Sequence, residues 1–103
     1  MIVEIECLPT PPGTDEVEFE HVESAIAIIQ QSGLTYEVGA LGSTVEGDPD
    51  ELWALLRRVH EACLESGADS VVSVIKVGQR AVDDGTPWME GLTAPFRNGD
   101  PPS

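Results

Sequence analysis

Residues 43–53 read STVEGDPDELW, and within this stretch an extended segment ends and a helix begins. The alternating run stops at Gly47, and an acidic cluster with one proline follows at once. Asp48 stands where a helix N-cap belongs, Pro49 at the first helical position, and Glu51 three residues after the cap. Acidic groups there cap free backbone N–H groups and meet the positive end of the helix dipole. The cluster therefore predicts a helix start in preference to a metal site or a catalytic carboxylate group.

On either side of this helix start, hydrophobic periodicity predicts two helices and four strands. Asp15 is the expected N-cap of the first helix, and Gly33 ends that helix in a left-handed conformation. Gly39 and Gly42 mark the turn or bulge of a strand hairpin. The predicted elements are a strand over 1–9, a helix over 16–33, a hairpin over 34–47, a helix over 49–67 and a strand over 70–78.

This order of elements is β-α-β-β-α-β, which predicts an α+β fold of the ferredoxin-like plait type. Two helices would cover one face of a four-stranded antiparallel sheet. We expect one such domain over residues 1–80. Residues 81–103 are rich in proline, glycine and acid and predict an irregular C-terminal tail. Because Trp88, Met89, Leu92 and Phe96 lie in its middle, we expect the tail to dock through residues 86–97.

The second face of the predicted sheet has no helix to cover it. Ile2, Leu8 and part of the strand over 70–78 would lie on that face. Leaving this apolar surface in water is unfavourable, so we expect a second copy to pack there. The sequence therefore predicts a homodimer or a homotetramer formed through the open sheet face.

The chain is strongly acidic, with 19 Asp and Glu against 5 Lys and Arg and a net charge of −14. Such a surface repels nucleic acid and anionic membranes and disfavours a polyphosphate ligand, but it tolerates cations. The same acidity is expected of a protein built for solubility in high salt. We expect a soluble, cytoplasmic protein, because no transmembrane run exists and the N-terminus reads as a strand rather than a signal peptide.

The catalytic inventory of the sequence is thin. No nucleophile elbow, phosphate-binding loop or dinucleotide fingerprint is present. His21 and His60 lack a second ligand at metal spacing, and Cys7 and Cys63 read as small buried hydrophobes rather than a zinc or redox pair. The sequence therefore predicts no enzyme, no catalytic residue and no metal.

A group of polar side chains does share one face of the predicted sheet: Glu4 and Glu6 of the first strand with Thr44 and Glu46 of the third. Buried carboxylates need partners, which a cationic or amine-bearing ligand would supply. Alternatively, these glutamates are exposed at strand ends or paired with Lys76 and Arg80. The pattern favours neither interpretation over the other.

Five groups of residues occur along the chain in a recognisable order and spacing: Met1, Ile2, Ile5 and Pro9; Ser32, Gly33, Leu34 and Tyr36; Gly42, Thr44, Glu46 and Gly47; His60 and Glu61; Ile75, Lys76, Val77 and Arg80. In this order and spacing they resemble the small thiamine-binding protein family, long an uncharacterised conserved family. The likeness covers residues 1–80, and one departure is Gly42-Ser43-Thr44 where the family has Gly-Thr directly.

The resemblance implies a ferredoxin-like homo-oligomer that binds thiamine or its hydroxymethylpyrimidine moiety, without a reaction or a further cofactor. Glu6 and Glu46 would pair with the aminopyrimidine or the thiazolium cation, and Tyr36 would offer a stacking surface. Either Ser43 or Thr44 would supply the hydroxyl group. The alternative is an oligomeric assembly or regulatory module that senses another small metabolite. An enzyme is least expected, since His60 and Glu61 are adjacent on a helix and point to different sides.

Overall fold

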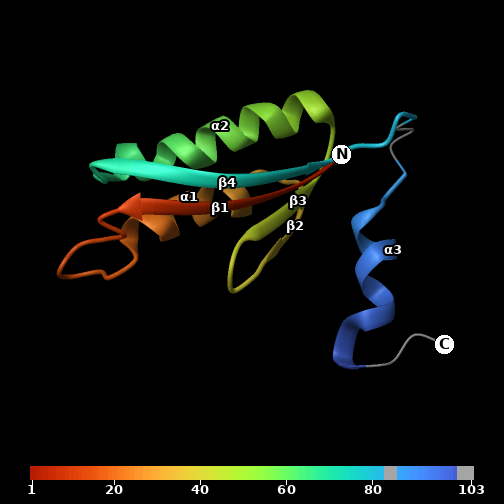
Figure 1. Ribbon diagram of the computed structural model, residues 1–103, viewed down its shortest axis with the longest axis horizontal. Helices are drawn as coiled ribbons and strands as arrows, with labels where there is room; N and C mark the ends of the chain where they lie inside the picture. The colour runs from red at the N-terminus through yellow and green to blue at the C-terminus, as the bar shows by residue number, and fades with distance from the viewer. Residues whose placement is uncertain (83–85, 100–103) are drawn as a thin grey trace.

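The protein folds as a four-stranded antiparallel sheet with two helices packed on one face (Figure 1). The structure, a computed structural model, describes residues 1–82 and 86–99. The strands lie in the order β2-β3-β1-β4, which confirms the predicted ferredoxin-like α+β fold. The elements are β1 (Ile2–Thr10), α1 (Glu20–Gln30), β2 (Thr35–Val38), β3 (Ser43–Glu46), α2 (Pro49–Ser66) and β4 (Ser70–Gly78).

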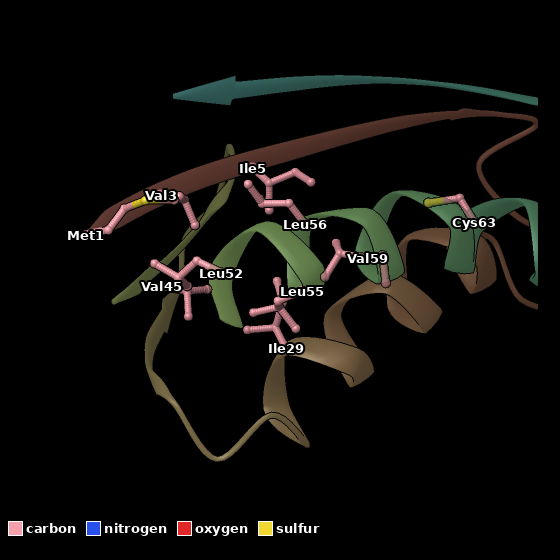
Figure 2. Packing of buried hydrophobic residues seen from close by; sticks show 11 residues of the cluster. Met1, Val3, Ile5, Ile29, Val45, Leu52, Leu55, Leu56, Val59 and Cys63 are labelled. Carbon is pink, nitrogen blue, oxygen red and sulfur yellow. The ribbon is translucent and has the colours of Figure 1, made fainter. Parts of the chain in front are cut away.

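The hydrophobic core lies between the sheet and the two helices (Figure 2). Alternate residues of the strands and one stripe of each helix meet there. This follows from the side-chain repeat of about 2 residues in a strand and about 3.6 residues in a helix. The side chains with at most 1% exposure are Val3, Ile29, Val45, Leu52, Leu55, Val59 and Cys63. Burial of this apolar surface stabilises the fold by about 25 cal/mol for each Å² removed from water.

Helix α2 begins as the sequence predicts. The Asp48 carboxylate accepts a hydrogen bond from the backbone N–H of Asp50 at 3.1 Å, and Pro49 occupies the first turn. Gly67, with φ +124°, ends the helix. The acidic cluster at residues 48–51 is therefore a helix cap.

The predicted N-cap of the first helix at Asp15 is wrong, because the N-cap is Phe19 and α1 begins at Glu20. The segment before it forms a turn of its own instead. Thr14 donates its backbone N–H to the Val17 carbonyl at 2.9 Å, and the Thr14 hydroxyl accepts from the Val17 N–H at 3.1 Å. A polar side chain that bonds its own backbone in this way competes with helix formation.

The strands of the sheet differ in length: β1 and β4 have nine residues each, and β2 and β3 have four each. β1 pairs with β4 along its whole length, from Ile2 to Thr10. It pairs with β3 only as far as Ile5, which lies opposite Ser43. The backbone of residues 6–10 therefore has no β3 residue opposite it on the hairpin side.

The face of the sheet away from the helices is open. Leu8, Val72 and Val74 are 49%, 63% and 50% exposed there. Leu8 and Val72 lie opposite each other in the β1–β4 pairing, so the exposed apolar groups are contiguous. That a second copy covers them stays a prediction.

The C-terminal segment holds a short helix, α3 (Met89–Thr93), and a 3-10 turn over Ala94–Gly99. Figure 1 shows α3 beside the end of the sheet where β1 begins and β4 ends. Residues 83–85 and 100–103 of the expected tail lie outside the described residues. No helix in residues 1–82 and 86–99 is long and apolar enough to cross a membrane.

Candidate functional site

A pocket of about 380 Å³ lies between β1, α1 and the loop that joins β2 to β3. We call it the hairpin pocket. Its walls are residues 5–8 of β1, the side chains of Phe19, Val22, Ala25, Ile26 and Ile29, loop residues 39–42, Ser43 and Val59.

The hairpin pocket exists because the β2–β3 hairpin is shorter than β1. Gly39 donates its N–H to the Gly42 carbonyl at 2.9 Å and closes the loop. A Cβ atom at Gly42 would lie 3.3 Å from the Ile5 carbonyl oxygen, so the small residue lets the loop approach β1 closely. Beyond that point the hairpin no longer covers β1 or the facing side of α1.

The hairpin pocket is mainly apolar, with a few polar groups at its wall. Phe19 is 51% exposed and offers a free aromatic surface. Ser43 is only 5% exposed, and its hydroxyl lies on the helix-facing side of β3. An apolar cavity of this size with few placed polar groups is the usual form of a small-molecule site.

A second pocket, of about 400 Å³, lies between the start of α2 and the C-terminal segment. We call it the tail pocket. It is more polar, and Glu46 contributes to its wall together with Asp48 and Thr35. Thr86 and Pro87 close it from the tail side.

The five residues that sequence reasoning placed in one site do not come together. Ser43 and Glu6 line the hairpin pocket, and Glu46 lines the tail pocket. Thr44 lies between Glu4 and Glu37 on the open face of the sheet. Tyr36, opposite Val45, lies on the other face of the sheet and lines neither pocket.

The Glu46 carboxylate is engaged by the C-terminal segment. Its Oε2 atom accepts hydrogen bonds from the backbone N–H groups of Trp88 and Met89, at 2.7 and 2.9 Å. Arg80 lies 5.0 Å from the centre of the Trp88 ring and donates to the Thr86 carbonyl at 2.8 Å. Met89 is 3% exposed. Glu46 therefore holds the tail segment against the sheet.

The remaining predicted carboxylate, Glu4, forms a surface ion pair. The Lys76 Nζ atom lies 3.7 Å from Glu4 Oε1, and both side chains are substantially exposed. Such pairs contribute little to stability. Here the pairing with Lys76, one of the two interpretations that the sequence allowed, is what the structure shows.

Sequence reasoning missed the aromatic and aliphatic walls of the hairpin pocket. Val22 and Ile26 lie on the apolar stripe of α1, and Phe19 comes just before its first residue. In the sequence all three have the pattern of core residues. The signal that distinguishes them is length, since the strands 35–38 and 43–46 are too short to cover a nine-residue strand and an eleven-residue helix.

Fold and pocket together define a small ferredoxin-like domain with an apolar ligand-sized pocket beside its β2–β3 hairpin. Residues 3–91 match the family described as "Thiamine-binding protein", and the chain belongs to this family. The family match indicates a thiamine-related role.

Sequence relatives and solved structures from several organisms are similar to this chain. A UPF0045 protein of Clostridium perfringens is 34% identical over 67 residues, covering 65% of this chain and 70% of its own. The structure of a domain of unknown function, DUF77, from Bacillus cereus matches with a TM-score of 0.76 and 29% identity over 97% of this chain and 94% of that one. A Thermotoga maritima protein provisionally assigned to thiamine biosynthesis or salvage matches with a TM-score of 0.76 and 26% identity, over 93% and 97%.

Proposed function

We propose that this protein binds thiamine or its hydroxymethylpyrimidine moiety in the hairpin pocket and catalyses no reaction on it. The observation that carries this proposal is a ligand-sized apolar pocket, about 380 Å³, at the hairpin of a member of the thiamine-binding protein family. The similarity to a Thermotoga maritima protein provisionally assigned to thiamine biosynthesis or salvage supports the same ligand class.

The chemistry of the pocket suits both halves of thiamine. The aliphatic side chains of α1 and the free face of Phe19 would pack against the flat rings. The backbone of residues 6–8, which has no β3 residue opposite it, offers donors and acceptors to the aminopyrimidine. Glu6 lines the pocket, although its side chain alternates onto the open face with Glu4 and Leu8, so the thiazolium cation is favoured mainly by the net charge of −14. The ligand brings no phosphate that would need Lys or Arg.

In this proposal Ser43, and not Thr44, supplies the ligand-binding hydroxyl. The two residues are adjacent on β3, and successive strand residues face opposite sides of a sheet. Ser43 lines the hairpin pocket, while Thr44 faces the open side between Glu4 and Glu37. The extra residue of the Gly42-Ser43-Thr44 stretch thus has a clear geometric consequence. In this proposal neither Glu46 nor Tyr36 contacts the ligand. Glu46 binds the C-terminal segment, and Tyr36 lies on the edge strand β2.

The experiment is calorimetric titration of the wild type, Ser43→Ala, Thr44→Ala and Glu46→Gln with thiamine and with hydroxymethylpyrimidine. We expect Ser43→Ala to weaken binding by about 3- to 10-fold, the effect of one lost hydrogen bond. Thr44→Ala, a change of similar size on the neighbouring residue, leaves the affinity unchanged. Glu6→Gln and Glu4→Gln form a second matched pair on β1.

Each outcome of the titration is informative. If Glu46→Gln weakens binding and Ser43→Ala does not, the ligand occupies the tail pocket. If neither thiamine nor hydroxymethylpyrimidine binds, the ligand proposal fails, and the alternative is a regulatory module that senses another small metabolite.

We also propose that two or four copies assemble through the open sheet face. Support comes from Leu8, Val72 and Val74, which form a contiguous apolar surface at one end of that face. Contiguous exposed apolar groups of this kind often mark a site where another protein binds.

A further inference from the structure

Three hydrogen-bonded side chains, His60 of α2, Ser73 of β4 and Cys7 of β1, connect the helix to the sheet. We call them the His60–Ser73–Cys7 relay. The Nδ1 atom of His60 lies 2.5 Å from the Ser73 hydroxyl oxygen. The Ser73 hydroxyl in turn donates to the Cys7 sulfur at 3.4 Å. Ser73 and Cys7 lie opposite each other in the β1–β4 pairing, so the sheet itself fixes their separation.

The Ser73 hydroxyl has one proton, and it is directed at the Cys7 sulfur. The Ser73 oxygen can accept a hydrogen bond from His60 at the same time when the Nδ1 atom of His60 carries a proton. One donor, the Ser73 hydroxyl, therefore points at Cys7, and His60 acts on the sulfur only through Ser73.

A second thiol lies beside Cys7. Cys63, on the buried face of α2, is 0% exposed and belongs to the core cluster in Figure 2. Burial raises the pKa of Cys63 to about 12, and the charge of Cys7 and a hydrogen bond with it add to the effect. Cys63 therefore stays a neutral thiol at pH values where an exposed thiol ionises.

The two cysteines differ in burial. Cys7 is half-buried and lines the hairpin pocket, whereas Cys63 is enclosed in the core. A partly accessible, hydrogen-bonded thiol with a second thiol beside it is the arrangement found in redox-sensing cysteine pairs.

We propose that Cys7 and Cys63 form a peroxide-sensitive dithiol, in which Cys7 is oxidised first and Cys63 then closes an intramolecular disulfide. The Cys7 thiolate attacks the terminal oxygen of a hydroperoxide, an S–O bond forms, the O–O bond breaks, and the departing alkoxide or hydroxide takes a proton from water. The sulfur loses two electrons and becomes a sulfenic acid, while the peroxide is reduced to an alcohol or water.

The second step uses Cys63. Its sulfur attacks the Cys7 sulfur, an S–S bond forms, and the S–O bond breaks. The hydroxyl group leaves with the Cys63 proton as water, so two thiols and one hydroperoxide give one disulfide and either two waters or one water and one alcohol. The disulfide would link β1 to α2 at the base of the hairpin pocket.

The experiment treats the full chain with hydrogen peroxide and follows its intact mass and its cysteine-containing peptides. In the wild type we expect the loss of two hydrogen atoms, a peptide linking Cys7 to Cys63, and full reversal by dithiothreitol. Cys63→Ser should instead accumulate a Cys7 sulfenic acid that dimedone captures. Cys7→Ser should remain unmodified.

The role of the His60–Ser73–Cys7 relay is tested by measuring the rate of Cys7 oxidation in variants of Ser73 and His60. Ser73→Ala should slow the oxidation of Cys7 about tenfold, the effect of losing a hydrogen bond to a charged group. His60→Gln, a change on a partly exposed helix position, should slow it by less. Ser24→Ala is the matched control, because Ser24 hydrogen-bonds elsewhere, to the Glu20 carbonyl and Ser66.

Three results would overturn the proposal. One is oxidation of Cys7 no faster than that of free cysteine. Another is a disulfide that joins two chains, seen as a covalent dimer on a non-reducing gel. The third is a Cys7 that proceeds to sulfinic acid in the wild type without ever bonding to Cys63. The result does not depend on thiamine, since no step of the assay uses the ligand.

Discussion

The Glu46 carboxylate accepts the backbone N–H of Trp88 at 2.7 Å, and this contact joins β3 to a segment more than forty residues further along the chain. The same oxygen accepts the N–H of Met89 at 2.9 Å. Two donors on one charged acceptor make the carboxylate a polar anchor of the C-terminal segment.

Replacing Glu46 with glutamine should therefore weaken the docking of the tail. A neutral amide oxygen accepts less strongly than a carboxylate, and we expect a loss of about 1–2 kcal/mol. The readout is Trp88 fluorescence in a Trp53→Phe background, where the emission should shift to the red as the ring enters water. Glu4→Gln, which removes only an exposed ion pair with Lys76, is the control. Unchanged emission in Glu46→Gln would show that other contacts hold the segment.

A second prediction concerns the contribution of Phe19, in the wall of the hairpin pocket, to thiamine binding. This ring is 51% exposed and forms part of the pocket wall, so its truncation should cost little stability but remove a packing surface for a bound ring. We expect Phe19→Ala to weaken thiamine binding about tenfold, as loss of one aromatic contact does. Trp53→Ala is the matched control, since Trp53 is 53% exposed and lies on α2 outside the pocket. Calorimetry should show the wild-type affinity for this control, and an equal loss in both variants would argue against the pocket.

The fold could be predicted from sequence because its main signals are local. Asp48 caps α2 with a side chain two residues from the N–H that it bonds, and such contacts depend on no distant segment. The failure at Asp15 has the same kind of cause, because Thr14 offers the backbone a competing turn with Val17. Nothing in the hydrophobic period distinguishes a capped helix start from such a turn.

The site was harder to predict than the fold, because it depends on register and on length. The two faces of β3 were assigned correctly from alternation, yet which face carries the pocket depends on where the hairpin stops relative to β1. Ile5 is the last β1 residue that β3 covers, and this limit is a tertiary property. The hydrogen bond between Glu46 and Trp88 could not be predicted for the same reason, since the two residues are distant in the sequence.

The open sheet face leads to a prediction about assembly. If a second copy covers Leu8, Val72 and Val74, a charge placed among them should separate the copies, because burying an unpaired carboxylate is costly. We expect light scattering to give a dimer or tetramer for the wild type and a monomer for Val72→Glu. Leu64→Glu is the control, since Leu64 is 44% exposed on α2, away from this face. A wild-type mass equal to one chain would contradict the prediction.

The buried thiol of Cys63 makes the stability depend on alkaline pH. Its pKa rises from the ordinary value of 9.0 to about 12 on folding, chiefly through burial. Above pH 9 the unfolded chain releases this proton while the folded chain retains it, so the unfolded state gains stability as the pH rises. As the pH rises from 9 towards 12, we expect this group to lower the free energy of unfolding progressively. The measurement is urea unfolding of the wild type and of Cys63→Ala under reducing conditions, in which the variant should lack this part of the slope. Parallel pH profiles for the two proteins would mean that Cys63 ionises alike in the folded and unfolded states.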